Sequence, residues 1–344
     1  MTEEIFYNAA TLVKWSNFRE LENLKKKYST WQKVWASLST EVKKSCSPEK
    51  EWAKLEKAGV SLTLSHHPHF PALLKEIPWT PFGIYSLGNL NKINQTSLAI
   101  VGTRKASESG REIAKKFARK IAGWGINVIS GLALGIDAKS HEGALEAKGY
   151  TVAVIASGLD KLYPKTNEKL AQKILGSGGA IISEYPLGSP SLPQRFIERN
   201  RLVSGLAHGL LVIEAPQGSG ALATTRFALD QNRDVFVVPG PITHPNFIGS
   251  HELIRQGAAL VTKPEEILEI LAPALLEKEN SPRRVNPETE EEKIILEVLL
   301  KSGKPVTIDK IIELTNLNAK IINQTLSFLT LKNSIQETDQ GYTL

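Results

Sequence analysis

Three residues suited to phosphate binding follow one predicted strand. Gly102 comes directly after the apolar run 98–101, and Thr103 and Arg104 come next. Glycine lets the chain turn where a Cβ would clash, and the planar guanidinium of an arginine can bind a phosphate through two hydrogen bonds. Ser107 lies at the expected start of a helix, where it can cap the helix and where free N–H groups attract anions. The pattern fits a phosphate site, and it equally fits a capped helix with a solvated arginine.

More basic residues follow later strands. Lys165 comes after the predicted strand 151–155 and, taken alone, is most simply a solvated loop residue. The helical stretch after the fourth strand carries Arg195, Arg199 and Arg201. Arg195 and Arg199 are four residues apart and therefore share one helix face. Such a cluster suits phosphates or a surface helix, and only geometry separates the two.

The segment 218–223 matches the relaxed dinucleotide-binding pattern G-x-G-x-x-A. That pattern normally follows the first strand, with an acidic residue about 20 positions further on. Here it follows the fifth strand, at 210–213, and the nearest acidic residues come too early. A dehydrogenase is therefore a poor interpretation. The backbone N–H groups of Ser219 and Gly220 at a helix start remain a candidate phosphate site.

Asp137 and His141 could form an acid–base pair, because they share a helix face. No third member of a triad accompanies them, so we expect Asp137 to brace its turn and His141 to bond a neighbouring loop. The chain has no Walker A, H-E-x-x-H or G-x-S-x-G pattern, and Cys46 is its single cysteine. The three histidines within 66–69 are interpreted as loop residues. The inventory predicts binding rather than catalysis, with no metal and no cofactor.

The elements that carry these residues alternate between strands and helices. The predicted strands are 98–101, 127–129, 151–155, 180–182, 210–213, 235–238 and 259–261. The predicted helices between them are 113–121, 138–147, 170–175 and 222–229. This alternation predicts an α/β fold whose parallel sheet has helices on both faces. Ligands of such sheets bind at the carboxyl ends of the strands, near a switch in strand order.

Charge divides the 344-residue chain into three modules. Its formal net charge of +6 is split as +4 over 1–96, +4 over 97–288 and −2 over 289–344. The composition, 41% hydrophobic and 23% charged, excludes a disordered or fibrous chain. The charge permits a nucleic-acid partner without demanding one. No apolar run approaches the ~18–20 residues of a membrane span, so we expect a cytoplasmic protein with no membrane partner.

The two outer modules are expected to be mainly helical. Apolar residues at helical spacing run through 12–28, which includes Trp15, and through 31–38, and we interpret the tryptophans as core. The segment 80–88 predicts a turn and a short strand. The last module predicts three short helices and a hairpin, as in a winged helix. Its candidate recognition helix, 318–331, carries a single charge, so a protein contact is expected rather than duplex DNA.

The order of the motifs resembles one known family. The segments that carry the resemblance are 99–104, 130–137 with His141, 158–160, 163–164, 183–186, 199–201, 205–206, 219–224, 238–240, 253–254 and 257–258. Over 97–265 the chain resembles the DNA-processing protein DprA (Smf) family. The resemblance implies a Rossmann-like, doubly wound, mostly parallel sheet. Its implied modules are a helical SAM-like domain 1–85, a DNA-binding domain 86–271, a linker 272–288 and a winged helix 289–344.

The resemblance also implies a function and partners. Members bind single-stranded DNA without catalysis, protect it, and load the RecA recombinase onto it during natural transformation, as homodimers through the Rossmann-like domain. The family's DNA pocket falls on Gly102, Thr103, Arg104 and Lys165, and its Arg-Asn-Arg motif falls on 199–201. Leu134 and 196–198 depart from the usual basic pattern. The predicted DNA-binding residues are Gly102, Thr103, Arg104, Ser107, Lys165, Arg195, Arg199, Arg201, Ser219 and Gly220.

One enzymatic alternative has a similar core. Nucleoside-monophosphate phosphoribohydrolases of the lysine-decarboxylase-like group carry a glycine-rich loop with a key glutamate. The corresponding loop here, 216–224, has no glutamate. The chain therefore lacks the key acid of that group. Release of a base from a nucleotide by the purified protein would favour this alternative.

Overall fold

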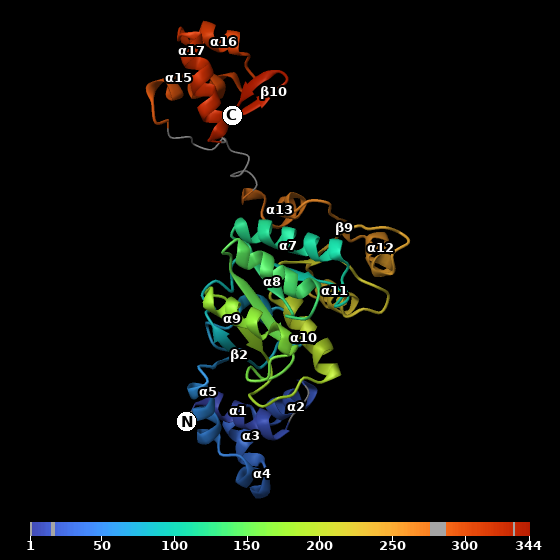
Figure 1. The fold of residues 1–344 in the computed structure, drawn as a ribbon. Helices are drawn as coiled ribbons and strands as arrows, with labels where there is room; N and C mark the ends of the chain where they lie inside the picture. The colour runs from blue at the N-terminus through green and yellow to red at the C-terminus, as the bar shows by residue number, and fades with distance from the viewer. Residues whose placement is uncertain (1, 15–17, 276–286, 333) are drawn as a thin grey trace. The chain divides into compact units, whose positions relative to one another are not determined.

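The computed structural model describes most of the chain (Figure 1). The described residues are 2–14, 18–275, 287–332 and 334–344. Contacts divide the chain into two compact units, Met1–Ala272 and Pro273–Leu344. No helix among the described residues is long and apolar enough to cross a bilayer.

A nine-stranded sheet lies at the centre of the first unit, in the order β1-β2-β6-β5-β4-β3-β7-β8-β9. Strands β3 to β9 run parallel, whereas β1 and β2 pair antiparallel to their neighbours. The strands are β1 Ser61–Leu64, β2 Gly83–Gly88, β3 Ser97–Val101, β4 Asn127–Ser130, β5 Thr151–Ile155, β6 Ala180–Ser183, β7 Gly209–Val212, β8 Asp234–Val237 and β9 Ala259–Leu260. The predicted parallel sheet is confirmed, and each predicted strand is present to within one residue at its ends.

Helices cover both faces of this sheet (Figure 1). In β5, Val152 and Val154 belong to the core shared with α10 and α11, whereas Ala153 and Ile155 belong to the core shared with α8 and α9. Alternate side chains of a strand point to opposite faces, which explains why these strands are apolar throughout. The helices are α7 Glu108–Gly123, α8 Ile136–Glu146, α9 Glu168–Gly176, α10 Pro193–Gly205, α11 Gly220–Asp230, α12 Ile248–Arg255 and α13 Glu265–Leu271. The layers form the expected Rossmann-like fold.

The strand order reverses between β3 and β7. The strands β4, β5 and β6 follow β3 in one direction across the sheet, and β8 and β9 follow β7 in the other. Ligands of doubly wound sheets bind at such a switch point, outside the carboxyl ends of the strands. Gly102 follows β3 at this edge, and Glu214 follows β7.

Short helices around an aromatic core make up the N-terminal part of the first unit. They are α1 Glu3–Lys14, α2 Phe18–Tyr28, α3 Trp31–Ser37, α4 Thr40–Ser45, α5 Pro48–Lys57 and α6 Ala72–Lys75. The ring of Trp31 is 2% exposed and meets that of Tyr7 edge-on, with centroids 4.8 Å apart. Trp35 is buried as well, so the core role predicted for these two tryptophans is confirmed. Trp15 lies outside the described residues.

The N-terminal part joins the central sheet directly. Strand β1, which the sequence did not reveal, pairs with β2, and β2 pairs with β6. The predicted boundary at residue 85 therefore falls inside β2, a strand of the shared sheet.

Within residues 287–332 and 334–344, the second unit contains three helices and a hairpin. They are α15 Glu290–Ser302, α16 Ile308–Thr315, α17 Ala319–Leu331, β10 Gln336–Thr338 and β11 Gly341–Thr343. Ile295, Ile311 and Ile322 form part of their common core. This is the element order that the sequence predicted, and the winged-helix assignment stays a prediction. Most of the predicted linker, 276–286, lies outside the described residues.

Candidate nucleic-acid interface

A small cavity of about 40 Å³ lies where the loops after β3, β4 and β5 meet. Its lining residues are Arg104, Gly131, Ala133, Leu134, Tyr163, Pro164 and Phe196. Segments far apart in the sequence are therefore brought to one edge of the sheet, as expected for the carboxyl ends of parallel strands.

An exposed cation and two aromatic rings form the wall of this cavity. The guanidinium carbon of Arg104 lies 5.0 Å from the ring centroid of Phe196. The ring of Tyr163 meets Phe196 edge-on at 5.6 Å and is 49% exposed. Surfaces that bind single-stranded nucleic acids combine such cations with aromatic rings on which bases stack. The sequence analysis missed Tyr163 and Phe196, although both are aromatic residues beside predicted basic site residues.

Gly102 and Thr103 shape the loop that presents Arg104. A Cβ on Gly102 would lie 2.5 Å from Cγ1 of Ile136, so only glycine fits against α8 here. The backbone N–H of Thr103 donates to the carbonyl oxygen of Glu214 at 2.8 Å. The loop is thereby tied to the end of β7, across the switch point.

Lys165 lies on the loop that carries Tyr163. It is exposed and begins the short 3-10 helix η1, Lys165–Asn167. The side-chain Nδ2 of Asn167 donates to the carbonyl oxygen of Leu132 at 2.9 Å. This bond holds the loop against the turn after β4. Lys165 is the residue after Pro164, which lines the cavity.

The start of α7 is already occupied by a carboxylate. Glu214 is fully buried, and its Oε2 accepts hydrogen bonds from the N–H of Ser107 at 3.0 Å and from Nδ2 of Asn246 at 2.7 Å. Its Oε1 accepts from the hydroxyl of Ser107, which itself accepts from the N–H of Gly110. The amide and hydroxyl of Ser107 are therefore engaged within the chain. The structure differs here from the predicted phosphate contact, because Glu214 fills the anion position at the helix start.

Arg199 lies beside the cavity but below the surface. It is 4% exposed, and its Nη1 donates to the carbonyl oxygens of Gly131, at 2.6 Å, and Val154. Burial lowers its pKa to about 10. The carboxylate of Asp137 accepts from the N–H groups of Gly131 and Ala133, so it braces this turn as predicted. Arg199 thus fastens the ends of β4 and β5 and is not presented to a phosphate.

His141 has a structural partner in the sheet. Its Nδ1 lies 2.7 Å from the hydroxyl oxygen of Thr151, the first residue of β5. The predicted partner, a neighbouring loop, was wrong. Burial, with a smaller effect of the Arg199 charge, lowers the pKa of His141 to about 3. Within the described residues, no group of three or more His, Cys, Asp or Glu residues is placed to hold a metal ion.

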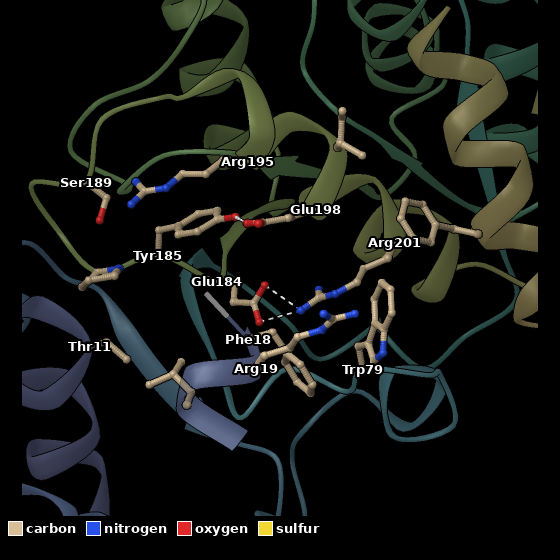
Figure 2. A pocket seen from close by; sticks show the side chains of 14 residues that line it. Thr11, Phe18, Arg19, Trp79, Glu184, Tyr185, Ser189, Arg195, Glu198 and Arg201 are labelled. Carbon is tan, nitrogen blue, oxygen red and sulfur yellow. Dashed lines mark hydrogen bonds and ion pairs between the residues drawn. The ribbon is translucent and has the colours of Figure 1, made fainter. Parts of the chain in front are cut away.

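Arg195 and Arg201 line a different and larger cavity (Figure 2). Nη2 of Arg201 bonds both carboxylate oxygens of Glu184, at 2.7 and 2.8 Å. The guanidinium of Arg195 lies 4.5 Å from the ring centroid of Tyr185, and its Nη1 donates to the carbonyl oxygen of Pro190. Both arginines are buried. The predicted arginine cluster of α10 therefore does not converge on one site.

Ser219 and Gly220 lie at the start of α11, outside both cavities. Ser219 occupies the N-cap position without a side-chain capping bond, and Gly220 is exposed. Nδ2 of Asn200 donates to the carbonyl oxygen of Gly220 at 3.3 Å. This helix start follows β7, so it adjoins the switch point without contributing to the Arg104 cavity.

Comparison with known sequences identifies relatives. The family model described as DNA recombination-mediator protein A matches residues 61–272. Protein Smf of Escherichia coli is 42% identical over 217 residues, which cover 63% of this chain and 58% of that protein. DNA processing protein DprA of Streptococcus pneumoniae is 36% identical over 222 residues, 62% of this chain and 78% of that protein. The matched part thus spans little more than half the length of the Escherichia coli relative.

Solved structures show the same fold. The X-ray structure of DNA processing protein A from Streptococcus pneumoniae has a TM-score of 0.66 at 30% identity, and covers 79% of this chain and 98% of that one. A structure of DNA processing protein A from Helicobacter pylori, described for its single-stranded DNA binding mode, has a TM-score of 0.56 at 27% identity, covering 64% of this chain and 96% of that one. Because the family model matches more than half of the chain, and the motifs and the fold agree with it, this chain belongs to the DNA recombination-mediator protein A family, the DprA (Smf) family that its motifs predicted.

Proposed function

We propose that this protein binds single-stranded DNA, without catalysis, at the surface formed by Arg104, Tyr163, Lys165 and Phe196. The observation that carries the proposal is the group formed by the exposed Arg104 guanidinium, the half-buried Phe196 ring and the exposed Tyr163 ring at the carboxyl ends of the strands. The description of the Helicobacter pylori relative as a single-stranded DNA binder supports it.

The chemistry of this surface favours a single strand over a duplex. Arg104 and Lys165 supply positive charge for phosphates, and the exposed ring of Tyr163 offers a face to a base. In a duplex the bases are stacked and paired, so their faces cannot reach such a ring. Gly102 and Thr103 position the loop, while Ser107 and Arg199 support the surface from within.

The groups that could catalyse a reaction beside this surface have other roles. Asp137 braces the turn after β4, His141 bonds Thr151, and Glu214 accepts hydrogen bonds from Ser107, the N-cap residue of α7. The loop 216–224 supplies no carboxylate in place of the glutamate of the phosphoribohydrolases. These observations support a protein that binds and protects its strand rather than one that cleaves nucleotides.

The cellular part of the proposal follows from family membership. The protein loads the RecA recombinase onto incoming single strands during natural transformation, and it acts as a homodimer through its Rossmann-like part. RecA filament assembly on strands covered by a single-strand-binding protein should become faster when the protein is added. A monomer mass near 37.8 kDa in sedimentation would contradict the dimer.

Fluorescence anisotropy with a labelled dT oligomer and a matching duplex tests the binding site. We expect the single strand to be preferred. Each phosphate contact contributes about 0.7 to the log–log salt slope for single strands, so Arg104→Ala should weaken binding and flatten the slope by about that amount. Arg119→Ala, at an exposed arginine of α7 outside the Arg104 cavity, is the matched control. Unchanged affinity and slope in Arg104→Ala would remove this residue from the site.

A further inference from the structure

A second cavity, of about 370 Å³, lies between α10 and the N-terminal helix α2 (Figure 2). Its volume falls in the range of small-molecule sites. Helix α2 contributes Phe18 and Arg19 to its lining, and α10 contributes Glu198 and Arg201. No lining residue is shared with the Arg104 cavity. The two cavities therefore have separate linings, although both are lined by residues of α10.

Aromatic side chains form much of the wall of this cavity. Phe18, Trp79, Tyr185 and Phe227 all line it. Trp79 is 54% exposed, and its ring meets that of Phe227 edge-on at 6.5 Å. Walls of this kind suit a flat, aromatic ligand ring.

Buried hydrogen-bonding atoms at this cavity are left without partners. Arg201 is 3% exposed; its Nη2 bonds Glu184, but its Nη1 has no partner among the described residues. The fully buried hydroxyl of Ser189 likewise has none within the part of the chain that is described. A buried donor without a partner lowers the stability of the fold, so these atoms indicate a ligand that accepts hydrogen bonds.

A carboxylate faces Arg201 across the cavity. Figure 2 shows Glu198 and Tyr185 on one side of the space, and Arg201 with Glu184 on the other. Oε2 of Glu198 accepts from the hydroxyl of Tyr185 at 2.8 Å. An ionised carboxylate has about four acceptor sites, so Glu198 can accept further hydrogen bonds.

Among the described residues, the charges that line the cavity sum to +1. The arginines are Arg19, Arg195 and Arg201, and the acids are Glu184 and Glu198. A small excess of positive charge favours a ligand that carries negative charge, such as a phosphate. The cavity therefore combines aromatic walls, an acceptor edge, a buried donor and attraction for an anion.

We propose that this cavity binds a guanine base that carries a phosphate. Guanine presents two adjacent N–H donors, at N1 and N2, with the O6 acceptor beside them. Glu198 accepts from the two donors, Nη1 of Arg201 donates to O6, and the ring lies against the aromatic wall with the phosphate toward Arg19. Adenine instead presents an acceptor at N1, whose lone pair would oppose the Glu198 carboxylate. The ligand is a free guanine nucleotide or a guanine of the bound strand.

Calorimetric titration of the full-length protein with dGMP and dAMP tests this proposal. We expect dGMP to bind at least about tenfold more tightly than dAMP, because a mismatched charged acceptor costs about 1.5–3 kcal/mol, equal to roughly 10- to 100-fold in affinity. Glu198→Gln should lower the dGMP affinity by a similar factor. Glu269→Gln, at an exposed glutamate outside the cavity, should bind dGMP as the parent protein does. Absence of dGMP binding, or equal affinity for the two nucleotides, would overturn the proposal.

A second variant guards against effects on folding. Trp79 is exposed, so the Trp79→Ala variant should fold normally. It should bind dGMP more weakly, because one of the aromatic rings that line the cavity is lost. Circular dichroism melting of both variants checks the fold. If both variants keep the fold and bind dGMP as tightly as the parent protein, the guanine site is not this cavity.

Two oligomers distinguish the sources of the base. If a dT strand with one central dG binds more tightly than an all-dT strand, and Glu198→Gln removes the difference, the guanine belongs to the bound strand. If both strands bind equally while dGMP still binds, the ligand is the free nucleotide. The titration of Arg104→Ala with the all-dT strand tests the proposed DNA surface. Failure of the DNA-binding proposal and failure of the guanine proposal can therefore be told apart.

Discussion

The Nη1 atom of Arg199 lies 2.6 Å from the carbonyl oxygen of Gly131 and also donates to the carbonyl oxygen of Val154. A single buried guanidinium thereby joins the turn after β4 to β5, beside the cavity that Arg104 lines. A Cβ on Gly131 would lie 2.4 Å from that same Nη1, so the turn and the arginine fit each other closely. Arg199 supports the DNA surface from within, whereas Arg104 presents charge to solvent.

Arg199→Ala should therefore destabilise the fold rather than act on DNA binding alone. The substitution removes both carbonyl contacts, and it also removes the arginine charge that most lowers the pKa of the buried Asp137 carboxyl. Leaving these two buried carbonyl oxygens without their donor costs about 1–3 kcal/mol for each. Urea unfolding followed by circular dichroism measures the loss, with Arg119→Ala as a control expected within about 0.5 kcal/mol of the parent. Lost DNA affinity at unchanged stability would instead make Arg199 a direct contact.

The sheet and its functional edge could be predicted because both depend on short stretches of sequence. Strands buried on both faces are apolar throughout, as Val152, Ala153 and Val154 show. Residues just after parallel strands must meet at one edge, and this placed Arg104 and the loop of Lys165 correctly relative to the sheet. Neither inference depends on side-chain packing between distant segments.

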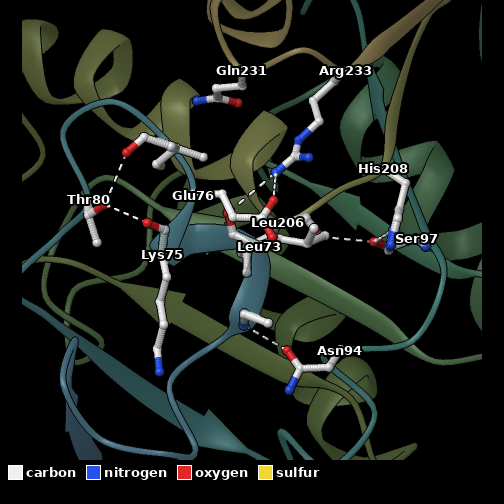
Figure 3. Close-up of polar contacts among 12 residues, drawn as sticks. Leu73, Lys75, Glu76, Thr80, Asn94, Ser97, Leu206, His208, Gln231 and Arg233 are labelled. Atoms are coloured by element: carbon white, nitrogen blue, oxygen red, sulfur yellow. Dashed lines mark hydrogen bonds and ion pairs between the residues drawn. The ribbon is translucent and has the colours of Figure 1, made fainter.

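Side-chain partners between distant segments could not be predicted. Glu214 lies 107 residues from Ser107 in the sequence, and nothing local to either residue shows that they meet. The direction in which each arginine side chain of α10 points depends on the partner that it contacts. Arg233 is a similar case (Figure 3). It pairs with Glu76 at 3.6 Å and donates to the carbonyl oxygen of Leu73, which ties the α6 region to the turn between α11 and β8. Strand β1 was missed because four residues carry too weak a pattern.

The buried imidazole of His141 should make the protein less stable in acid. Its pKa falls from 6.5 to about 3 on folding, so the unfolded chain binds the proton more readily between these values. The stabilisation from a neutral His141 is complete above pH 6.5 and is lost as the pH falls toward 3, by up to about 5 kcal/mol at 1.36 kcal/mol per pKa unit. Urea unfolding from pH 7 to pH 4 measures this dependence.

His141→Asn is the informative variant for this test, because it keeps a polar partner for Thr151 and does not titrate. Its stability should fall less steeply with acid than that of the parent protein. Burial raises the pKa of Asp137, which acts in the opposite direction and is common to both proteins. His69→Asn, at an exposed histidine, should follow the parent curve. Identical slopes for the parent and His141→Asn would contradict the neutral, buried state.

Tyr163→Ala should weaken single-strand binding without changing its salt dependence. Stacking of a base on an aromatic ring contributes about 1–3 kcal/mol, and it releases no counterions. Anisotropy titrations at several salt concentrations separate this effect from that of Arg104→Ala, which should flatten the slope. Tyr163→Phe keeps the ring and should bind nearly as the parent does. Equal losses in Tyr163→Ala and Tyr163→Phe would assign the effect to the hydroxyl and not to stacking.

Removal of the second unit should leave single-strand affinity within about threefold of the full chain. Residues 1–272 form a compact unit that contains Arg104, Tyr163, Lys165 and Phe196, whereas residues 289–344 carry a net charge of −2. A basic face is the electrostatic requirement for phosphate binding, and α17 carries Lys320 as its single charged residue.

The exposed surface of α17 supports the same expectation. Phe328 is 52% exposed and Leu331 is 79% exposed, and apolar side chains of this kind suit a protein contact better than a phosphate backbone. Anisotropy with the dT oligomer compares the 1–272 chain with the full chain, after circular dichroism has shown that the shorter chain folds. A loss of tenfold or more in a folded 1–272 chain would place DNA contacts in the second unit.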